Sequence, residues 1–218
     1  MSARQAARGK PTSGSDGRFA IALRMTASTA AHFRGVSKAT DLPIMVYNNP
    51  PIYRNDVTPD ILATLANCDT IVCFKESSGD TRRFTDVRNL VGERFVMFAG
   101  LDDVVVESIL VGAVGWVSGL SNVFPQEGET LFRLARARRF DELQPIYDWF
   151  MPLLHLDARP DLVQCIKLCE HLAGRGTWRT RPPRLALEGA ERAAVEAIMR
   201  KAMANRPSLP DVGLPRAA

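Results

Sequence analysis

The sequence predicts an α/β protein with a parallel sheet, followed by a region that contains only helices. Four short apolar segments of strand character alternate with helical segments between residues 43 and 118, and short connections join them. This alternation is typical of repeated βα units, whose strands form a parallel sheet. Beyond Pro125 the pattern is helical throughout. A hydrophobic content of 46% and a charged content of 24% agree with an ordinary soluble globular protein.

The strands are indicated by short apolar runs that end at turn-forming residues. We expect them at Pro43–Tyr47, Thr70–Lys75, Phe95–Ala99 and Ala113–Ser118. The first ends at residues 48–51, where two asparagines and two prolines favour a turn. The apolar second run predicts a strand that is buried on both faces, as in parallel sheets.

The helices of the βα units are indicated by their capping residues. We expect them at Ser28–Ala39, Thr58–Asn67, Asp80–Leu90 and from Asp102 or Asp103 to Leu110. Thr58 followed by Pro59 is a strong helix start, because the threonine caps the helix and proline fits its first turn. Gly92 ends the third of these helices.

The C-terminal region is predicted to hold four further helices. They are expected at Pro125–Arg138, Phe140–Leu154, Asp161–Ala173 and Glu188–Ala204. Residues 1–18 are basic and poor in apolar residues, which predicts disorder, and Pro207–Ala218 is expected to be frayed. The chain therefore divides into a tail at 1–25, the βα units at 26–124, a helical region at 125–205 and a second tail at 206–218.

Composition disfavours several classes of function. No apolar run approaches the roughly 20 residues of a membrane span, and residues 1–18 lack the apolar segment of a secretory signal. The arginines are not interleaved with exposed aromatic residues, so no nucleic-acid partner is expected. Four cysteines without CxxC spacing indicate reduced thiols in a cytoplasmic protein. No metal site is expected, because His171 lies on a different helix face from Cys165 and Cys169.

Lys75 is the strongest candidate for a catalytic residue. It lies at the carboxyl end of the second strand, where an α/β sheet opens its active-site crevice. Burial there favours the neutral amine, which is the nucleophile that forms a Schiff base with a carbonyl carbon. The alternative is a lysine whose charged end simply reaches solvent at a strand end.

The other predicted strands also end in residues that suit a binding site. Tyr47 ends the first strand, Gly100 and Asp102 follow the third, and Ser118 ends the fourth. Because the carboxyl ends of parallel strands lie on one rim, these residues are expected to meet near Lys75. A tyrosine there can carry protons while a carbinolamine forms and collapses, and a glycine lets the backbone approach a substrate. Each of these residues alone has a structural explanation. The prediction of a binding site therefore depends on their all lying at the ends of successive strands.

Four motifs, in this order, resemble the dihydrodipicolinate synthase / N-acetylneuraminate lyase family of Schiff-base aldolases. They are VYNNP at Val46–Pro50, FKESSGD at Phe74–Asp80, FAGLDD at Phe98–Asp103 and GAVGWVSGLSN at Gly112–Asn122. The resemblance covers about residues 26–205. It implies a partial (β/α)8 TIM barrel, made of about the last four βα units, with a C-terminal helical extension. It also implies a homo-oligomer, a tetramer in the family, that acts on a small 2-oxo or cyclic imino acid.

The resemblance assigns roles to individual residues. Lys75 matches the lysine that forms the Schiff base, and Tyr47 matches the tyrosine that relays protons. Four residues match the substrate-binding loop and the last strand segment that line the pocket: Gly100, Asp102, Gly115 and Ser118. No metal and no organic cofactor is implied, because the lysine itself serves as the electron sink.

Two segments favour one branch of the family. YNNPPIY at Tyr47–Tyr53 and FMPLLHLDARPDLVQCIKL at Phe150–Leu168 resemble members that act in hydroxyproline degradation. Those members deaminate 1-pyrroline-4-hydroxy-2-carboxylate to 2,5-dioxopentanoate. A pyruvate aldolase of the dihydrodipicolinate synthase or N-acetylneuraminate lyase type is the alternative.

The N-terminal part departs from the family pattern. Residues 1–45 contain neither the first barrel strands nor the Gly-Thr-Thr-Gly-Glu type motif whose threonine binds the substrate carboxylate. We therefore expect an open half barrel, in which interior side chains lack packing partners. The side chains expected to be affected are Val46, Val72, Phe74, Val96, Phe98 and Val117. A truncated, catalytically inactive chain that persists as an oligomerising scaffold is the alternative from another class of function.

Overall fold

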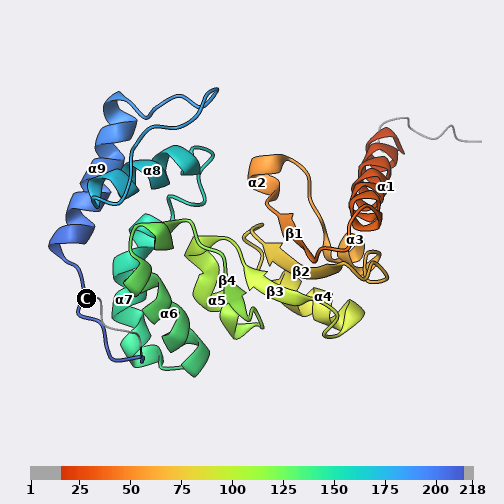
Figure 1. The fold of residues 1–218 in the computed structure, drawn as a ribbon, viewed down its shortest axis with the longest axis horizontal. Helices are drawn as coiled ribbons and strands as arrows, with labels where there is room; N and C mark the ends of the chain where they lie inside the picture. The colour runs from red at the N-terminus through yellow and green to blue at the C-terminus, as the bar shows by residue number, and fades with distance from the viewer. Residues whose placement is uncertain (1–15, 214–218) are drawn as a thin grey trace, which may run out of the picture.

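The computed structural model describes residues 16–213, with side chains from residue 27 onward. Its centre is a parallel sheet of four strands in the order β1-β2-β3-β4. The strands are β1 (Ile44–Asn48), β2 (Ile71–Glu76), β3 (Val96–Ala99) and β4 (Gly115–Trp116). Helices alternate with these strands (Figure 1), so the predicted βα units and their parallel sheet are confirmed.

The register of the sheet aligns residues from all four strands. Tyr47 is paired with Lys75, Lys75 with Phe98, and Phe98 with Gly115. Residues paired in this way direct their side chains to the same face of a sheet. Tyr47 and Lys75 therefore lie side by side near the carboxyl end of the sheet.

Helices and single 3₁₀ turns precede, connect and follow the strands. They are α1 (Asp16–Lys38), α2 (Pro50–Tyr53), α3 (Pro59–Ala63), α4 (Arg82–Val91), η1 (Asp102–Val104), α5 (Val105–Leu110) and η2 (Leu120–Asn122). The predicted start of α3 is confirmed, because the Thr58 hydroxyl accepts a hydrogen bond from the backbone N–H of Ile61. Gly92 ends α4 with a φ of 61°, a value that glycine adopts without steric cost.

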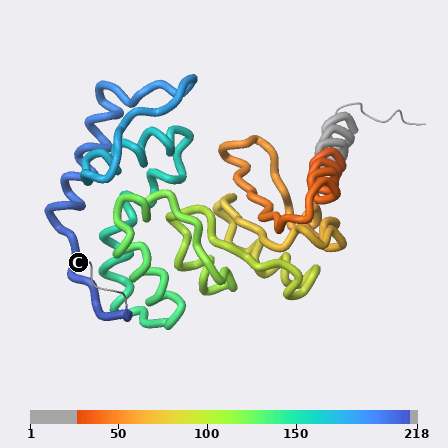
Figure 2. Tube along the Cα trace, viewed as in Figure 1, coloured from red at the N-terminus to blue at the C-terminus, as the bar shows by residue number. Residues whose placement is uncertain are grey.

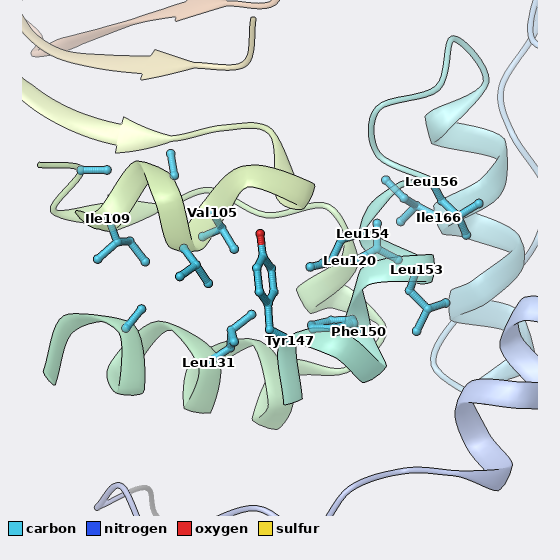
Figure 3. Packing of buried hydrophobic residues seen from close by; sticks show 14 of the residues in the cluster. Val105, Ile109, Leu120, Leu131, Tyr147, Phe150, Leu153, Leu154, Leu156 and Ile166 are labelled. Atoms are coloured by element: carbon cyan, nitrogen blue, oxygen red, sulfur yellow. The ribbon is translucent and has the colours of Figure 1, made fainter. Parts of the chain in front are cut away.

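The C-terminal region consists of helices, as predicted. They are α6 (Pro125–Ala137), α7 (Phe140–Leu154), α8 (Leu162–Leu172) and α9 (Gly189–Ala204). Figure 2 shows the chain passing into this region after β4 without returning to the sheet. Buried side chains join the two regions: Tyr147 on α7 points toward α5, and its hydroxyl donates to the Asp103 carbonyl oxygen at 2.9 Å (Figure 3).

The two faces of the sheet differ in how they are covered. Val46 and Phe74 are 0% and 1% exposed, because they lie on the face that the helices cover. On the opposite face, Met45 is 38% exposed and Val96 is 46% exposed. The prediction that interior side chains lack packing partners is therefore wrong for Val46 and Phe74. Side chains alternate between the two faces along a strand, and these two lie on the covered face. The prediction holds for Val96 and for Val117, which is 40% exposed.

The start of the first helix also differs from the prediction. Helix α1 begins at Asp16 and not at Ser28, so part of the segment expected to be a tail is helical. Alanine, leucine, methionine and arginine between these positions have high helix propensity, which outweighs the capping preference of Ser28. The predicted disorder of residues 1–15 lies outside the described residues.

The C-terminal segment is held in place over most of its length. Residues 207–213 were expected to be frayed, but the Arg133 guanidinium donates to the carbonyl oxygens of Val212 and Gly213 at 3.1 and 3.3 Å. Leu209 and Val212 also pack against the hydrophobic core. That prediction is therefore wrong for this segment, because apolar contact and hydrogen bonds to α6 compensate for the loss of chain entropy.

Candidate active site

Lys75 and Tyr47 form the centre of the candidate active site. The Nζ atom of Lys75 lies 4.1 Å from the centre of the Tyr47 ring. Asn49 Nδ2 donates a hydrogen bond of 2.8 Å to the Tyr47 hydroxyl oxygen. Tyr53 packs edge-on against Tyr47, with ring centroids 5.5 Å apart. Because the Tyr47 oxygen accepts this hydrogen bond, the phenolic O–H of Tyr47 can donate its proton to another group.

Gly100 lies against Lys75 at the end of β3. A Cβ atom at this position would lie 2.9 Å from Lys75 Cε and 2.7 Å from the Glu76 carbonyl oxygen, and it would overlap the Ser77 hydroxyl. The Gly100 N–H donates to the same Glu76 carbonyl at 2.8 Å. The close approach of the two chain segments therefore requires glycine, and the structure brings Gly100 next to Lys75 as the sequence predicts.

Asp102 is completely buried, and its carboxyl organises the end of β4. It accepts hydrogen bonds from Trp116 Nε1 at 2.9 Å, the Ser118 hydroxyl at 3.0 Å and the Leu120 N–H at 2.7 Å. The Gly119 N–H contributes a further bond of 3.1 Å. Asp102 and Ser118 thus bond to each other beneath the rim, and this arrangement supports the loop after β4. It differs from the predicted arrangement, in which both side chains face a substrate.

Gly115 provides space for an aromatic ring. A Cβ atom at this position would overlap the ring of Phe98, its neighbour in register on β3. Phe98 in turn is the register neighbour of Lys75. Gly115 therefore leaves space for the ring of Phe98, and it is itself two strands away from Lys75.

A polar network that the sequence did not indicate holds the ends of β1 and β2. Glu76, which is 4% exposed, accepts hydrogen bonds of 3.2 and 3.3 Å from Asn48 Nδ2. Asn48 also donates to Asp56, which forms two hydrogen bonds of 2.6 and 2.9 Å with Arg83. Arg83 lies 3.8 Å from Glu76. Since Asn48 and Glu76 are register partners, the network keeps the two strand ends aligned.

Two carboxyls influence the charge of Lys75. Burial lowers the pKa of Lys75, while Asp157 and Asp102 act in the opposite direction. Burial also raises the pKa of Asp157, whose Oδ2 atom accepts a hydrogen bond from the Asp102 N–H at 3.2 Å. Asp157 lies between α7 and α8, within the segment Phe150–Leu168 that was interpreted only as a sign of the family branch. Sequence reasoning missed it because it reaches the site only through packing of the helical region against the strand ends.

Among the described side chains, no group of three or more His, Cys, Asp or Glu residues is arranged to hold a metal ion. No helix within residues 16–213 is long and apolar enough to cross a membrane. Cys165 and Cys169 are buried free thiols, whereas the exposed His171 ring contacts the Gly176 carbonyl at 3.4 Å.

Comparison with known proteins identifies one group of relatives. Residues 22–202 match the dihydrodipicolinate synthetase family. A 4-hydroxy-tetrahydrodipicolinate synthase of Clostridium perfringens is 38% identical over 97 residues, which cover 44% of this chain and 33% of the relative. One from Syntrophobacter fumaroxidans is 32% identical over 124 residues, covering 57% of this chain and 43% of the relative.

Solved structures show the same fold. The structure of dihydrodipicolinate synthase from Aquifex aeolicus matches with a TM-score of 0.74 at 24% identity, covering 81% of this chain and 60% of that one. The enzyme from Thermotoga maritima matches with a TM-score of 0.73 at 21% identity, covering 82% and 62%. The chain thus spans about 60% of the length of these structures, and its fold is a partial (β/α)8 barrel with C-terminal helices.

Proposed function

The chain belongs to the dihydrodipicolinate synthetase family, and from this membership we propose that it is a Schiff-base-forming lyase for a small 2-oxo or cyclic imino acid. The observation that supports this most is the position of Lys75, whose Nζ lies 4.1 Å from the Tyr47 ring. Burial lowers the pKa of Lys75 and so favours the neutral amine. A neutral amine can attack a carbonyl or imine carbon.

Tyr47 is suited to move the protons of this reaction. When Lys75 Nζ attacks a 2-oxo carbon, a carbinolamine forms, and its hydroxyl must be protonated before it leaves as water. Asn49 already donates to the Tyr47 oxygen, so the phenolic O–H is free to give this proton. The resulting protonated Schiff base withdraws electrons from the neighbouring carbon, and the proposal therefore includes no cofactor.

The substrate that we propose is 1-pyrroline-4-hydroxy-2-carboxylate, which is converted to 2,5-dioxopentanoate and ammonia. Lys75 attacks the imine carbon, the 4-hydroxyl leaves as water, and hydrolysis releases ammonia and the free lysine, so that the overall reaction consumes one water. The support is the two segments that resemble deaminases of this kind. These segments contain Tyr53, which packs on Tyr47, and Asp157, which raises the pKa of Lys75.

A pyruvate aldolase is the alternative enzyme. The two curated relatives are named 4-hydroxy-tetrahydrodipicolinate synthases, which favours this alternative. Both reactions begin with the same Schiff base, so Lys75 and Tyr47 have the same roles in each.

We also propose that the chain forms a homo-oligomer in the cytoplasm. The exposed apolar side chains of Met45 and Val96 on the open face of the sheet favour association. Free thiols at all four cysteines favour a reducing compartment. The alternative from another class of function is an inactive scaffold, in which these exposed apolar side chains serve association alone.

Borohydride trapping tests the proposal. The protein is incubated with pyruvate or with 1-pyrroline-4-hydroxy-2-carboxylate, reduced, and analysed by intact mass and peptide mapping. We expect an adduct on Lys75 that is lost in Lys75→Arg and kept in Lys167→Arg, a control on α8. The more efficiently trapped compound identifies the branch. No adduct from protein that is shown to be folded would contradict the enzyme and support the scaffold.

A further inference from the structure

Asp157 belongs to the helical region, yet its carboxyl reaches the ends of two strands. Its Oδ2 accepts a hydrogen bond of 3.2 Å from the N–H of Asp102, just after β3. Its Oδ1 lies 2.8 Å from the place that a Cβ atom of Gly119 would occupy, just after β4. The carboxyl is therefore on the same rim as Lys75, which lies at the end of the neighbouring strand β2.

Of the two carboxyls that act on Lys75, only Asp157 is free to bind a substrate. Asp102 is 0% exposed and accepts hydrogen bonds from two side chains and two backbone N–H groups, so its oxygens are occupied. Asp157 is half-buried, and among the described residues the Asp102 N–H is its one hydrogen-bond donor. Lys75 forms no ion pair with it in that part of the chain. The Lys75 amine and the Asp157 carboxyl therefore interact through their charges, at a distance longer than that of an ion pair.

We propose that Asp157 is a substrate-binding residue that accepts a hydrogen bond from a hydroxyl group on the substrate, beyond the carbon that joins Lys75. The inference rests on the proposed function and narrows its substrate class to hydroxylated monocarboxylates. A carboxylate attracts a hydroxyl donor and repels a second carboxylate on the substrate. Burial raises the pKa of Asp157, so after substrate has bound the same carboxyl can take up a proton and pass it to that hydroxyl in a later step.

The same carboxyl can assist the loss of that hydroxyl as water. In this step the electron pair of the enamine formed on Lys75 makes a new carbon–carbon double bond. The C–O bond breaks, and the leaving hydroxyl takes the proton of the Asp157 carboxyl. The resulting carboxylate recovers a proton from water. Elimination of a hydroxyl two carbons from the Schiff base is the step that the deamination requires.

The variant Asp157→Asn distinguishes a role of Asp157 in binding and protonating the substrate hydroxyl from a purely structural role. The amide keeps an oxygen that can accept the Asp102 N–H, but it carries no charge and has no acidic proton. We expect the variant to trap pyruvate on Lys75 at least as well as the wild type, because loss of the carboxylate favours the neutral amine and pyruvate has no hydroxyl for Asp157 to bind. Trapping of 1-pyrroline-4-hydroxy-2-carboxylate should fall about tenfold or more, as for loss of a hydrogen bond to a charged group. Asp148→Asn, an exposed carboxylate on α7, is the control and should change neither. Equal losses for both compounds, or no loss for either, would overturn the inference.

A second measurement does not depend on turnover. Competitive acetylation of Lys75 across pH, followed by mass spectrometry, reports the pKa of its amine. Asp157 and Asp102 raise this pKa against the effect of burial, and the Tyr47 ring faces the same amine. Asp157→Asn should therefore shift acetylation of Lys75 to lower pH, and an unchanged profile would overturn the inference. If neither compound is trapped by the wild type while this shift occurs, the proposed function fails and the placement of Asp157 at Lys75 stands.

Discussion

Replacing Gly100 by alanine tests the geometry of the candidate site. The added Cβ would lie 2.7 Å from the Glu76 carbonyl oxygen and 2.9 Å from Lys75 Cε, well inside the optimal separation of about 3.5–4.0 Å between carbon atoms. The Gly100 N–H donates to that carbonyl at 2.8 Å, so β3 cannot move away from β2 without weakening this bond. Overpacking of this kind costs about 1–3 kcal/mol.

Urea unfolding measures this cost. For a slope of about 2 kcal/mol per molar, the midpoint of Gly100→Ala should fall by roughly 0.5–1.5 M. Trapping of pyruvate on Lys75 should fall as well, because the lysine stem must shift. Gly35→Ala is a matched control: a Cβ added there would meet nothing within 4 Å beyond its chain neighbours and its own helix backbone, and alanine favours a helix by about 0.5–1 kcal/mol. An unchanged midpoint together with unchanged trapping in Gly100→Ala would refute the reasoning.

Two further predictions concern charge. The fold lowers the pKa of Lys75 from 10.5. Between the folded pKa and 10.5 the unfolded chain therefore binds more protons than the folded chain does. The free energy of unfolding of the wild type should rise with pH through that interval. Lys75→Met should flatten this rise in urea titrations at several pH values, and identical slopes would contradict the assignment. Arg83→Ala leaves the buried Glu76 without its cation and Asp56 without its ion-pair partner, and should lower the free energy of unfolding by roughly 1–3 kcal/mol. Arg82→Ala, at 85% exposure, should change it far less, and equal effects of the two variants would show that the network does not stabilise the fold.

Signals within a few residues explain why some elements could be predicted closely. Helix α7 has the expected bounds, Phe140–Leu154, since its apolar residues repeat with helical spacing. Helix α2 was missed because Pro50 and Pro51 were interpreted only as the end of a strand. In the structure Asn49 caps this helix by accepting a hydrogen bond from the Ile52 N–H, and proline fits its first turn.

The role of Asp102 shows where local reasoning fails. Its position after β3 predicts a group on the rim, but the structure buries its carboxyl beneath the rim. Whether the carboxyl faces a substrate or the interior depends on Trp116 and Leu120, whose donors come from a different strand and loop. Four donors stabilise a buried carboxyl, and their arrangement is a property of the packed fold.

Local patterns alone were sufficient to establish the alternation of strands and helices, and the positions of Tyr47 and Lys75 at the ends of the first two strands. Strand periodicity, turn residues and helix caps act over a few residues, and a single chain displays them directly. Only the tertiary structure decided that Glu76 and Arg83 hold those strand ends together, and that Asp157 comes from the helical region to the rim on which Lys75 lies. Such contacts join residues far apart in the sequence, and they arise from packing that no local pattern encodes.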